Sequence, residues 1–202
     1  LAGQGAKVMQ TRAVEFANKY KVPVRVLSSF NDGNGTLISL KDESMENALV
    51  SGIAFQKDQV KFTLHSVGDT PGTAFKILGP ISDAEIEVDV IVQNVSIDDK
   101  TDFTFTVSNE DKESVEKILT ELKSEVDYKE VIINSDIAKV SLVGAGMRSQ
   151  TGVASKAFKA LSENDVNIQI ICTSEIKITM VIDESLVDKA VNVLHKEFEL
   201  EK

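Results

Sequence analysis

Hydrophobic and polar positions follow two periods along the chain, and the same succession of periods occurs twice. Alternation of apolar and polar residues is typical of half-buried strands, whereas apolar residues at i, i+3, i+4 and i+7 predict a helix packed on one side. Four strands are predicted in the first copy, at Val60–Val67, Ile86–Gln93, Thr101–Val107 and Val126–Ile133. Two helices carry the apolar stripes Ala74, Ile77, Leu78 and Ile81, and Val115, Ile118, Leu119 and Leu122. The order βαββαβ predicts an α+β fold, a ferredoxin-like antiparallel sheet with both helices on one face.

The second copy repeats this order but lacks its last strand. Its elements are predicted at Ile137–Val143, Gly152–Asn164, Val166–Cys172, Ile176–Ile182 and Glu184–Glu197. A missing strand would leave an apolar sheet edge uncovered, which soluble proteins avoid. The apolar stretch Asn47–Gln56 lies upstream of the first copy and has no partner of its own. We therefore expect it to complete the second sheet, so that the first module is inserted within the second.

An internal repeat supports this division into two modules. Gly72 corresponds to Gly152 at an offset of 80 residues, and the helix that follows each glycine has the same apolar stripe. The second stripe consists of Ala154, Ala157, Phe158 and Leu161. A repeat of this length is typical of two copies of one fold.

The residues before the repeat are too few to form a core of their own. A helix is predicted at Arg12–Tyr20 and short strands at Val22–Leu27 and Gly35–Ser39. This piece is interpreted as the tail of a preceding domain, and the abrupt start at Leu1 suggests a cut inside a longer protein. The predicted division is 1–46 for the tail and linker, 58–134 for the first module, and 47–57 plus 135–202 for the second.

Composition and charge exclude several classes of function. Hydrophobic residues make up 42% of the 202 residues, enough for a core, while 32 acidic against 22 basic residues give a net charge of −10. This charge repels nucleic acids and anionic membranes, so neither is an expected partner. Cys172 is the single cysteine, which predicts no internal disulfide and a cytoplasmic location. No apolar run approaches the ~20 residues that a membrane helix needs.

The turn that follows the first strand of each copy is the candidate binding feature. Thr70 is a predicted helix N-cap with Pro71 in the first helical position, and Gly72 and Gly152 lack a Cβ where a ligand would approach. Helix N-termini present unpaired N–H groups that attract a carboxylate. Polar side chains on the following strand are expected to face the same end, namely Glu87, Asp89, Gln93 and Asn94, and Asn167, Gln169, Thr173 and Ser174. Such a set suits a zwitterion, although an ordinary tight turn that needs glycine for packing explains the glycines equally well.

Catalytic and metal-binding patterns are poor. His65 and His195 lie in different modules without clustered cysteine or histidine, so we expect neither a metal site nor a cofactor. The short motif Gly144-Ala145-Gly146 lacks the third glycine of a dinucleotide fingerprint and is interpreted as a loop. Cys172 is interpreted as a small buried residue rather than a nucleophile. No phosphate-binding loop is present in the sequence.

Specific motifs add a resemblance to a known family. Gly5–Glu15 and Pro23–Val26 look like the end of the amino-acid-kinase catalytic domain of aspartate kinases. Four further motifs resemble the two ACT modules of that family, namely Val67–Gly72, Val92–Ser96, Lys139–Met147 and Ile171–Lys177. The resemblance implies an enzyme that phosphorylates the β-carboxylate of aspartate with ATP. It also implies an ACT region that binds lysine or threonine and turns the kinase down.

The same resemblance implies the residues that contact the effector. By motif, they are Asp69, Gly72, Thr73, Ala74, Val88, Asp89, Gln93 and Asn94 in the first module, and Met147, Ser149, Gly152, Val153, Ala154, Asn167, Ile168, Thr173, Ser174 and Glu175 in the second. One departure is Gln169, which stands where the first module has the acidic Asp89. The family's Lys-Phe-Gly-Gly nucleotide motif has no counterpart, so no kinase activity is expected of this chain alone.

The resemblance further implies a homodimer in which effectors lie between the first module of one chain and the second module of the other. It also implies association with an aspartate kinase catalytic domain or subunit. The alternatives are an ACT pair that controls another enzyme, an RNA-recognition fold and a free-standing enzyme. An RNA-recognition fold shares the topology but needs exposed aromatic residues and a basic surface, and Val88, Val90 and Val92 provide neither.

Overall fold

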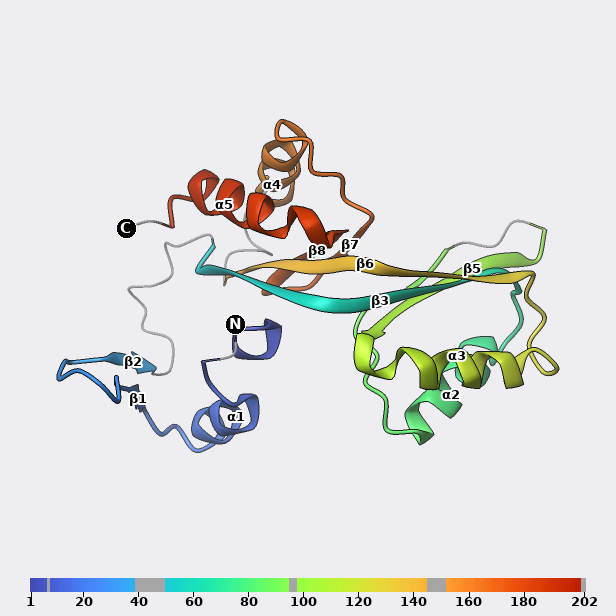
Figure 1. The fold of residues 1–202 in the computed structure, drawn as a ribbon, viewed down its shortest axis with the longest axis horizontal. Helices are drawn as coiled ribbons and strands as arrows, with labels where there is room; N and C mark the ends of the chain where they lie inside the picture. Colours follow the sequence, from blue (N-terminus) through green and yellow to red (C-terminus); the bar gives the residue numbers. More distant parts are fainter. Residues whose placement is uncertain (7, 39–49, 95–97, 145–151, 201–202) are drawn as a thin grey trace. The chain divides into compact units, whose positions relative to one another are not determined.

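The computed structural model describes residues 1–6, 8–38, 50–94, 98–144 and 152–200. Its main feature is a six-stranded sheet with the strand order β4-β5-β3-β6-β8-β7. Contacts divide the chain into unit 1, which comprises residues 1–56, 140–180 and 186–202, and unit 2, which comprises residues 57–139 and 181–185. Figure 1 labels the α-helices and the strands.

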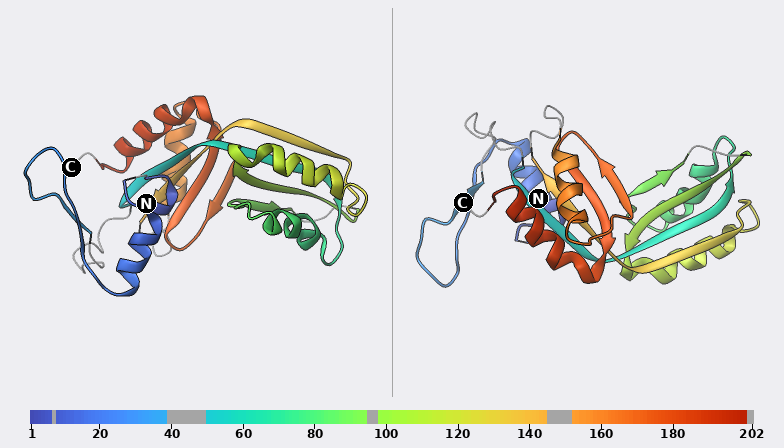
Figure 2. Two further views of the ribbon diagram at one scale, coloured as in Figure 1. Left: turned by 60° about the horizontal axis from the view of Figure 1, so that its bottom comes forward. Right: turned by 90° about the horizontal axis from the view of Figure 1, so that it is seen from above.

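Unit 2 contains one βαββαβ succession. Its elements are the later part of β3 (Gly52–Gly68), α2 (Thr73–Asp83), β4 (Ile91–Gln93), β5 (Lys100–Ser108), α3 (Lys112–Leu122) and the first part of β6 (Glu130–Val143). β5 pairs antiparallel with both β3 and β4. Because both pairings are antiparallel, β4 runs parallel to β3. Both helices cover one face of these strands (Figure 2), as predicted for a ferredoxin-like module.

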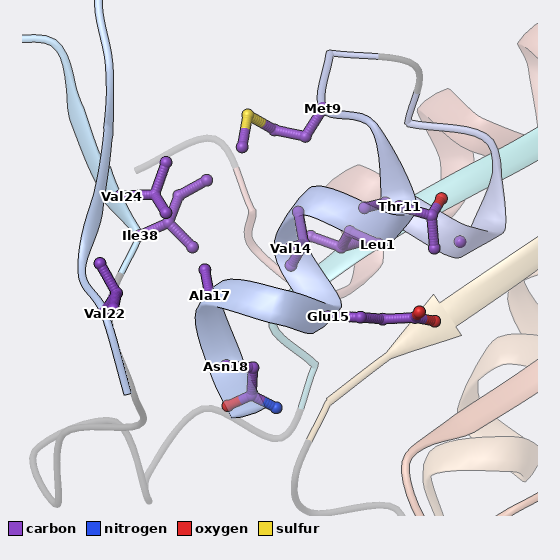
Figure 3. Close-up of a pocket in the computed structure, with 12 residues that line it drawn as sticks. Leu1, Met9, Thr11, Val14, Glu15, Ala17, Asn18, Val22, Val24 and Ile38 are labelled. Carbon is purple, nitrogen blue, oxygen red and sulfur yellow. The ribbon is translucent and has the colours of Figure 1, made fainter. Parts of the chain in front are cut away.

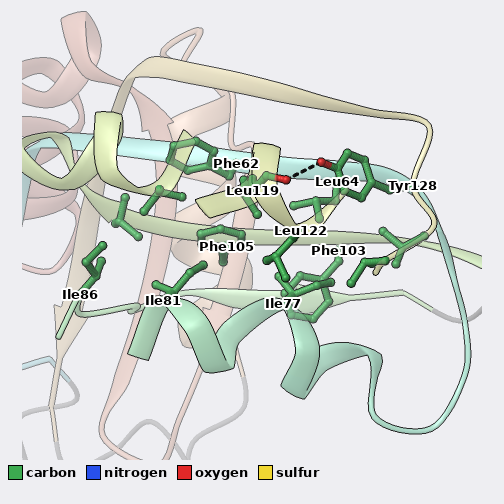
Figure 4. Packing of buried hydrophobic residues seen from close by; sticks show 14 of the residues in the cluster. Phe62, Leu64, Ile77, Ile81, Ile86, Phe103, Phe105, Leu119, Leu122 and Tyr128 are labelled. Atoms are coloured by element: carbon green, nitrogen blue, oxygen red, sulfur yellow. Dashed lines mark hydrogen bonds between the residues drawn. The ribbon is translucent and has the colours of Figure 1, made fainter. Parts of the chain in front are cut away.

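The core of unit 2 lies between this sheet and the two helices (Figure 4). Phe62, Phe103 and Phe105 are buried together: Phe62 and Phe105 stack with ring centroids 5.5 Å apart, and Phe103 is tilted by 55° against Phe105 at 6.3 Å. Tyr128 is buried beside them and donates a hydrogen bond of 2.7 Å from its hydroxyl to the Leu119 carbonyl oxygen. Among the described residues, unit 2 therefore holds more of the large, fully buried side chains than unit 1 does.

Unit 1 contains the second succession and the N-terminal segment. Its elements are η1 (Ala2–Gln4), α1 (Thr11–Lys19), β1 (Val24–Val26), β2 (Thr36–Ile38), the start of β3, the end of β6, α4 (Val153–Ser162), β7 (Ile170–Thr173), most of β8 (Lys177–Asp183) and α5 (Val187–Glu197). α4 and α5 pack against each other. They cover one face of the unit 1 strands, and η1 lies on the other (Figures 1 and 2).

The repeat persists in the backbone at an offset of 80 residues. Gly72 and Gly152 precede α2 and α4 with φ of 93° and 102°. At the other helix ends, Ile86 N donates to Ile81 O and Val166 N donates to Leu161 O. Glu85 and Asp165, at equivalent positions, both have positive φ. Two copies of one fold therefore share their helix-end geometry as well as their apolar stripes.

Several predicted boundaries are wrong. β3 is one strand of 17 residues from Gly52, where two strands were expected, and β6 likewise joins the two strands expected on either side of Asn134. Asp58 has φ of 58° inside β3, and its N–H donates to Glu184 Oε2 at 3.0 Å, so a local irregularity replaces the expected break. Residues 47–49 of the predicted Asn47–Gln56 stretch lie outside the described residues.

The two strands after the first helices are shorter than predicted. β4 begins at Ile91 instead of Ile86, and β7 begins at Ile170 instead of Val166. Ile86 and Val166 are buried without belonging to a strand, since their N–H groups bond back to the preceding helices. In the first module the backbone joins β5 just before β4 begins, since Asp89 N donates to Thr106 O and Thr106 N donates to Val90 O.

Candidate functional site

The turn before α2 is held by short side-chain and backbone bonds. Thr73 Oγ1 donates to Gly68 O at 3.0 Å and lies 3.0 Å from Thr70 Oγ1. The helix begins at Thr73 with Gly72 as its N-cap, so the predicted roles of Thr70 and Pro71 are wrong. Both residues belong to the turn that brings the chain to Gly72.

Open space lies in front of both helix starts. A Cβ built on Gly72 or Gly152 would meet no heavy atom of the described residues within 4 Å, apart from its own chain neighbours. Close packing against the described residues therefore does not require these glycines. Their left-handed backbone does, because φ near +100° is strained for any residue with a Cβ. The Thr73 N–H is bonded to the Thr70 carbonyl oxygen at 3.1 Å, and the described residues leave the space beside both N-cap glycines open.

The end of β4 brings two predicted residues to the start of α2. Gln93 Nε2 donates to Asp69 Oδ1 at 3.3 Å, and Asn94 O accepts a hydrogen bond of 2.8 Å from Thr101 Oγ1. Asp69 itself is fixed through its N–H, which donates to Asp99 O at 2.9 Å. An amide, a carboxylate and the helix start are therefore gathered at one end of unit 2.

Glu87, Val88 and Asp89 do not reach this end. Ile86, next to Glu87, is bonded to Ile81 near the end of α2, and Asp89 N donates to Thr106 O at 3.2 Å. Because β4 runs parallel to β3, the segment that leads into β4 starts beside the C-terminal end of α2. The four residues from Asp89 to Gln93 then span about 13 Å toward the helix start. The expectation that all four polar side chains face the helix start is wrong for Glu87 and Asp89.

Asp89 instead forms an ion pair with Lys139 of β6. The Lys139 side chain is 5% exposed and the Asp89 side chain 34% exposed. Lys139 Nζ also donates a hydrogen bond to Asp89 Oδ2. The carboxylate that the sequence offered for an effector ammonium group is thus engaged by an ammonium group of the chain itself.

In unit 1, the predicted site residues likewise lie at two opposite ends of the helix α4. Thr173 ends β7, and Ser174 and Glu175 form the turn that leads into β8. Asn167 and Ile168 lie beyond the other end of α4, where they line a hollow of about 460 Å³. The remaining lining residues are Phe158, Ser162, Asp165 and Val166. Val153, half-buried Ala154 and Gly152 form the helix start, whereas Met147 and Ser149 lie outside the described residues.

A histidine–aspartate pair that the sequence analysis did not single out lies at a bulge of β3. The register of β3 against β5 shifts between Leu64 and Val67, and Ser66 there has φ of 57°. Ser66 N donates to Asp102 Oδ1 at 2.9 Å, and His65 Nδ1 is hydrogen-bonded to the same oxygen. These two bonds, the backbone one first, lower the pKa of the Asp102 carboxyl below its ordinary value of 3.8.

Acid is expected to destabilise the protein partly through Asp102. A carboxyl whose pKa is lower in the folded state stabilises the fold above its unfolded pKa, and this contribution disappears as pH falls from about 4 through the folded value. Urea unfolding between pH 5 and 3 should show a shallower pH dependence for Asp102→Asn than for the unchanged chain. The exposed Asp32→Asn is the control, and equal slopes for all three would contradict the prediction.

The other residues considered for chemistry are dispersed. His195 lies in the last turn of α5, and Cys172 is half-buried on β7. Within the described ranges, no group of three histidine, cysteine, aspartate or glutamate side chains is placed to hold a metal ion. None of the helices in those ranges has the length and apolar character that crossing a membrane requires.

Comparison with known families shows which class of domain the two modules belong to. Family models for the ACT domain match residues 64–127 and 140–198. The chain is therefore a tandem of two ACT domains with ferredoxin-like α+β modules. The two matches cover the two copies of the repeat.

Comparison with individual proteins adds the family. Aspartate kinase of Pseudomonas fluorescens is 56% identical over 202 residues, which are all of this chain and 49% of that protein. A solved structure of aspartokinase alpha and beta subunits is 45% identical, covering 74% of this chain and 99% of that one at a TM-score of 0.70. The regulatory subunit of aspartate kinase from Thermus thermophilus is 32% identical with the same coverage and TM-score. The chain belongs to the aspartate kinase family and corresponds to its ACT-containing regulatory region. It spans about half the length of the curated relatives it matches.

Proposed function

We propose that this chain is the allosteric amino-acid-binding region of an aspartate kinase and that it senses threonine, lysine or both. The observation that carries the proposal is the open space at two equivalent helix starts, Gly72 and Gly152. An α-carboxylate would accept hydrogen bonds from the N–H groups there, in the field of the helix dipole. Membership of the aspartate kinase family supports an amino acid as the ligand.

Asp69 is the acidic group best placed for the ligand's ammonium group in the first module. Its carboxylate accepts a hydrogen bond from Gln93 near the start of α2. Asp89 is instead paired with Lys139, toward the opposite end of that helix. In the second module, Glu175 lies in the turn after β7, near Thr173 and Ser174. We infer that Asp69 and Glu175 take the role that the sequence pattern assigned to Asp89 and its neighbours.

We propose that a homodimer brings the remaining predicted residues to the effector. Val88, Asn167 and Ile168 lie at the helix ends opposite Gly72 and Gly152 of their own modules. In the proposed homodimer, a second copy would supply them to an effector at a helix start. Such a dimer, with effectors between the first module of one copy and the second of the other, is the bistable element that allosteric control needs.

The insertion of one module within the other is also a proposal. Unit 2 occupies residues 57–139 and 181–185, and unit 1 includes residues on both sides of that span. Ser51 N donates to Val143 O at 2.7 Å, which places the start of β3 beside the end of β6 in unit 1. These two facts support the predicted modules 58–134 and 47–57 plus 135–202.

The segment 1–46 is proposed to be the tail of a kinase domain. α1 has no buried residue, although Phe16 and Tyr20 stack on it with exposures of 57% and 64%. Figure 3 shows the apolar side chains around a hollow of about 370 Å³, among them Met9, Val14 and Val24. We propose that a catalytic domain or subunit covers this surface and carries the ATP, magnesium and aspartate sites, so that this chain alone has no kinase activity.

Thermal unfolding of the chain with each of the twenty amino acids tests the proposed function. A ligand at 100 times its dissociation constant stabilises the folded state by about 2.7 kcal/mol. We expect a shift with threonine, lysine or both, and a much smaller one for Gly72→Val, whose Cβ strains the helix start. Gly68→Ala is the matched control, since a Cβ there meets open space without a positive φ. No shift with any amino acid would contradict the proposal.

A further inference from the structure

The segment before α1 is fastened to the unit 1 sheet by the side chain of Gln4. Gln4 Oε1 accepts a hydrogen bond of 3.2 Å from Ser141 Oγ and one of 3.3 Å from Lys177 Nζ. Ser141 Oγ lies 2.8 Å from Thr179 Oγ1, and both residues are 2% exposed. Because Ser141 has one hydroxyl proton and gives it to Gln4, Thr179 must donate to Ser141. The network is therefore an ordered chain of donors that ends on one amide oxygen.

The backbone around Gln4 fits the sheet closely. Gly5 has φ of 98°, and a Cβ on it would lie 2.1 Å from the Phe55 carbonyl oxygen. A Cβ on Gly52 would lie 3.2 Å from the Leu1 side chain. Only glycine permits this approach at position 5, so the segment Leu1–Ala6 has one specific seat on β3.

Lys177 connects this seat to the turn between β7 and β8. Ser174 N donates to Lys177 O at 2.8 Å, and Lys177 N donates to Ser174 Oγ at 3.2 Å. The end of β6 is tied to the same turn, since Gly144 N donates to Ile176 O at 3.0 Å. A change in the turn that carries Ser174 and Glu175 therefore moves the residue whose ammonium group holds Gln4.

We propose that Gln4 is a positioning residue that couples the β7–β8 turn to the segment Leu1–Ala6 and, through it, to α1. When the turn holds Lys177 in place, Gln4 Oε1 accepts two hydrogen bonds and the segment Leu1–Ala6 stays bound to the sheet. When the turn is displaced, Gln4 loses its charged donor and the segment binds the sheet less tightly. The part of the proposal that concerns a ligand rests on the proposed function, because the bound amino acid is what would set the turn.

Hydrogen exchange of the ligand-free chain tests the coupling itself. The N–H groups of Gln4, Ala6 and Val8 donate to carbonyls of the segment, so their exchange reports whether it is seated. Loss of a hydrogen bond to a charged group should speed this exchange about tenfold in Gln4→Met. Gln4→Glu keeps the acceptor oxygen and should not speed it. Gln59→Met is the matched control, since the half-buried Gln59 side chain bonds only to the neighbouring Lys57 and Asp58 carbonyls in the described contacts.

A turn variant then separates coupling from simple loss of a contact. Ser174→Ala removes the acceptor for Lys177 N and should speed exchange in Leu1–Ala6 of the otherwise unchanged chain. In the Gln4→Met background the same change should have no further effect on this segment. Equal effects of Ser174→Ala in both backgrounds, or none in either, would overturn the proposal.

The effect of a bound amino acid on the segment Leu1–Ala6 is measured in a separate experiment. An amino acid that stabilises the chain should slow exchange of Leu1–Ala6 several-fold, and in Gln4→Met it should still raise the unfolding temperature without slowing that exchange. A ligand that slows the segment equally in both would overturn the coupling. If no amino acid binds, the proposed function fails, while the ligand-free double variant still decides the role of Gln4.

Discussion

Replacing Phe105 by alanine is expected to lower the free energy of unfolding by about 3–5 kcal/mol. Phe105 is fully buried on β5 and stacks against Phe62 at an interplanar angle of 13°. Its truncation removes apolar contacts and leaves a cavity between the sheet and the helices, which the packed rings of Phe62 and Phe103 fill only in part. A domain is stable by only about 5–15 kcal/mol, so unit 2 would lose much of its stability.

The measurement is urea unfolding followed by far-UV circular dichroism, because the chain has no tryptophan. Phe75→Ala is the matched control, since Phe75 is 79% exposed on α2. Surface substitutions of this kind usually change stability by less than about 0.5 kcal/mol. A loss below about 1 kcal/mol for Phe105→Ala would mean that the core between sheet and helices is not packed as described.

The paired modules were predictable from the sequence because each local signal has a periodic basis. Ile77 and Ile81 follow the helical stripe that packs on the sheet, and both are fully buried. Gly72 and Gly152 mark the two helix starts because few other residues tolerate a φ near +100°. Period and backbone strain are local properties, so a single sequence reveals them.

The arrangement of the candidate sites was only partly predictable. Asp89 and Gln93 fall in one predicted strand, and alternation alone does not tell which end of that strand meets the helix start. The direction of β4 relative to β3 decides this, and it depends on the pairing of both strands with β5. Gln93 therefore contacts Asp69 near the start of α2, whereas Asp89 pairs with Lys139.

Single polar contacts between distant segments left no signal in the sequence. Gln4 and Lys177 are 173 residues apart, and neither belongs to a motif with regular spacing. The continuous strand β3 was missed for a related reason. Polar residues around Asp58 look like a turn, but the Glu184 side chain, 126 residues away, satisfies the Asp58 N–H within the strand.

Replacing Asp89 by asparagine is expected to destabilise the folded chain by about 3 kcal/mol. Removing one partner of a buried ion pair typically costs about 3–5 kcal/mol, because the other charge stays buried without compensation. The lower end applies here, since Lys139 is 5% exposed but Asp89 is 34% exposed and partly screened by water. Urea unfolding of the purified variant measures the loss.

The double variant Asp89→Asn with Lys139→Met is expected to recover most of this stability, because an apolar side chain of similar length replaces the buried ammonium group. Asp127→Asn is the control for a surface pair, since Lys100 and Asp127 are 39% and 82% exposed and such pairs contribute less than about 1 kcal/mol. A double variant no more stable than Asp89→Asn would contradict the assignment of the loss to an uncompensated Lys139.

The same variant distinguishes a structural from an effector-binding role of Asp89. If Asp89 held the ammonium group of an amino acid, Asp89→Asn would abolish the ligand-induced rise in unfolding temperature and leave the ligand-free stability almost unchanged. Pairing with Lys139 predicts the opposite, a large loss without ligand and a retained ligand-induced rise. Asp69→Asn should then give the first pattern, because Asp69 lies at the helix start that the ligand is proposed to occupy.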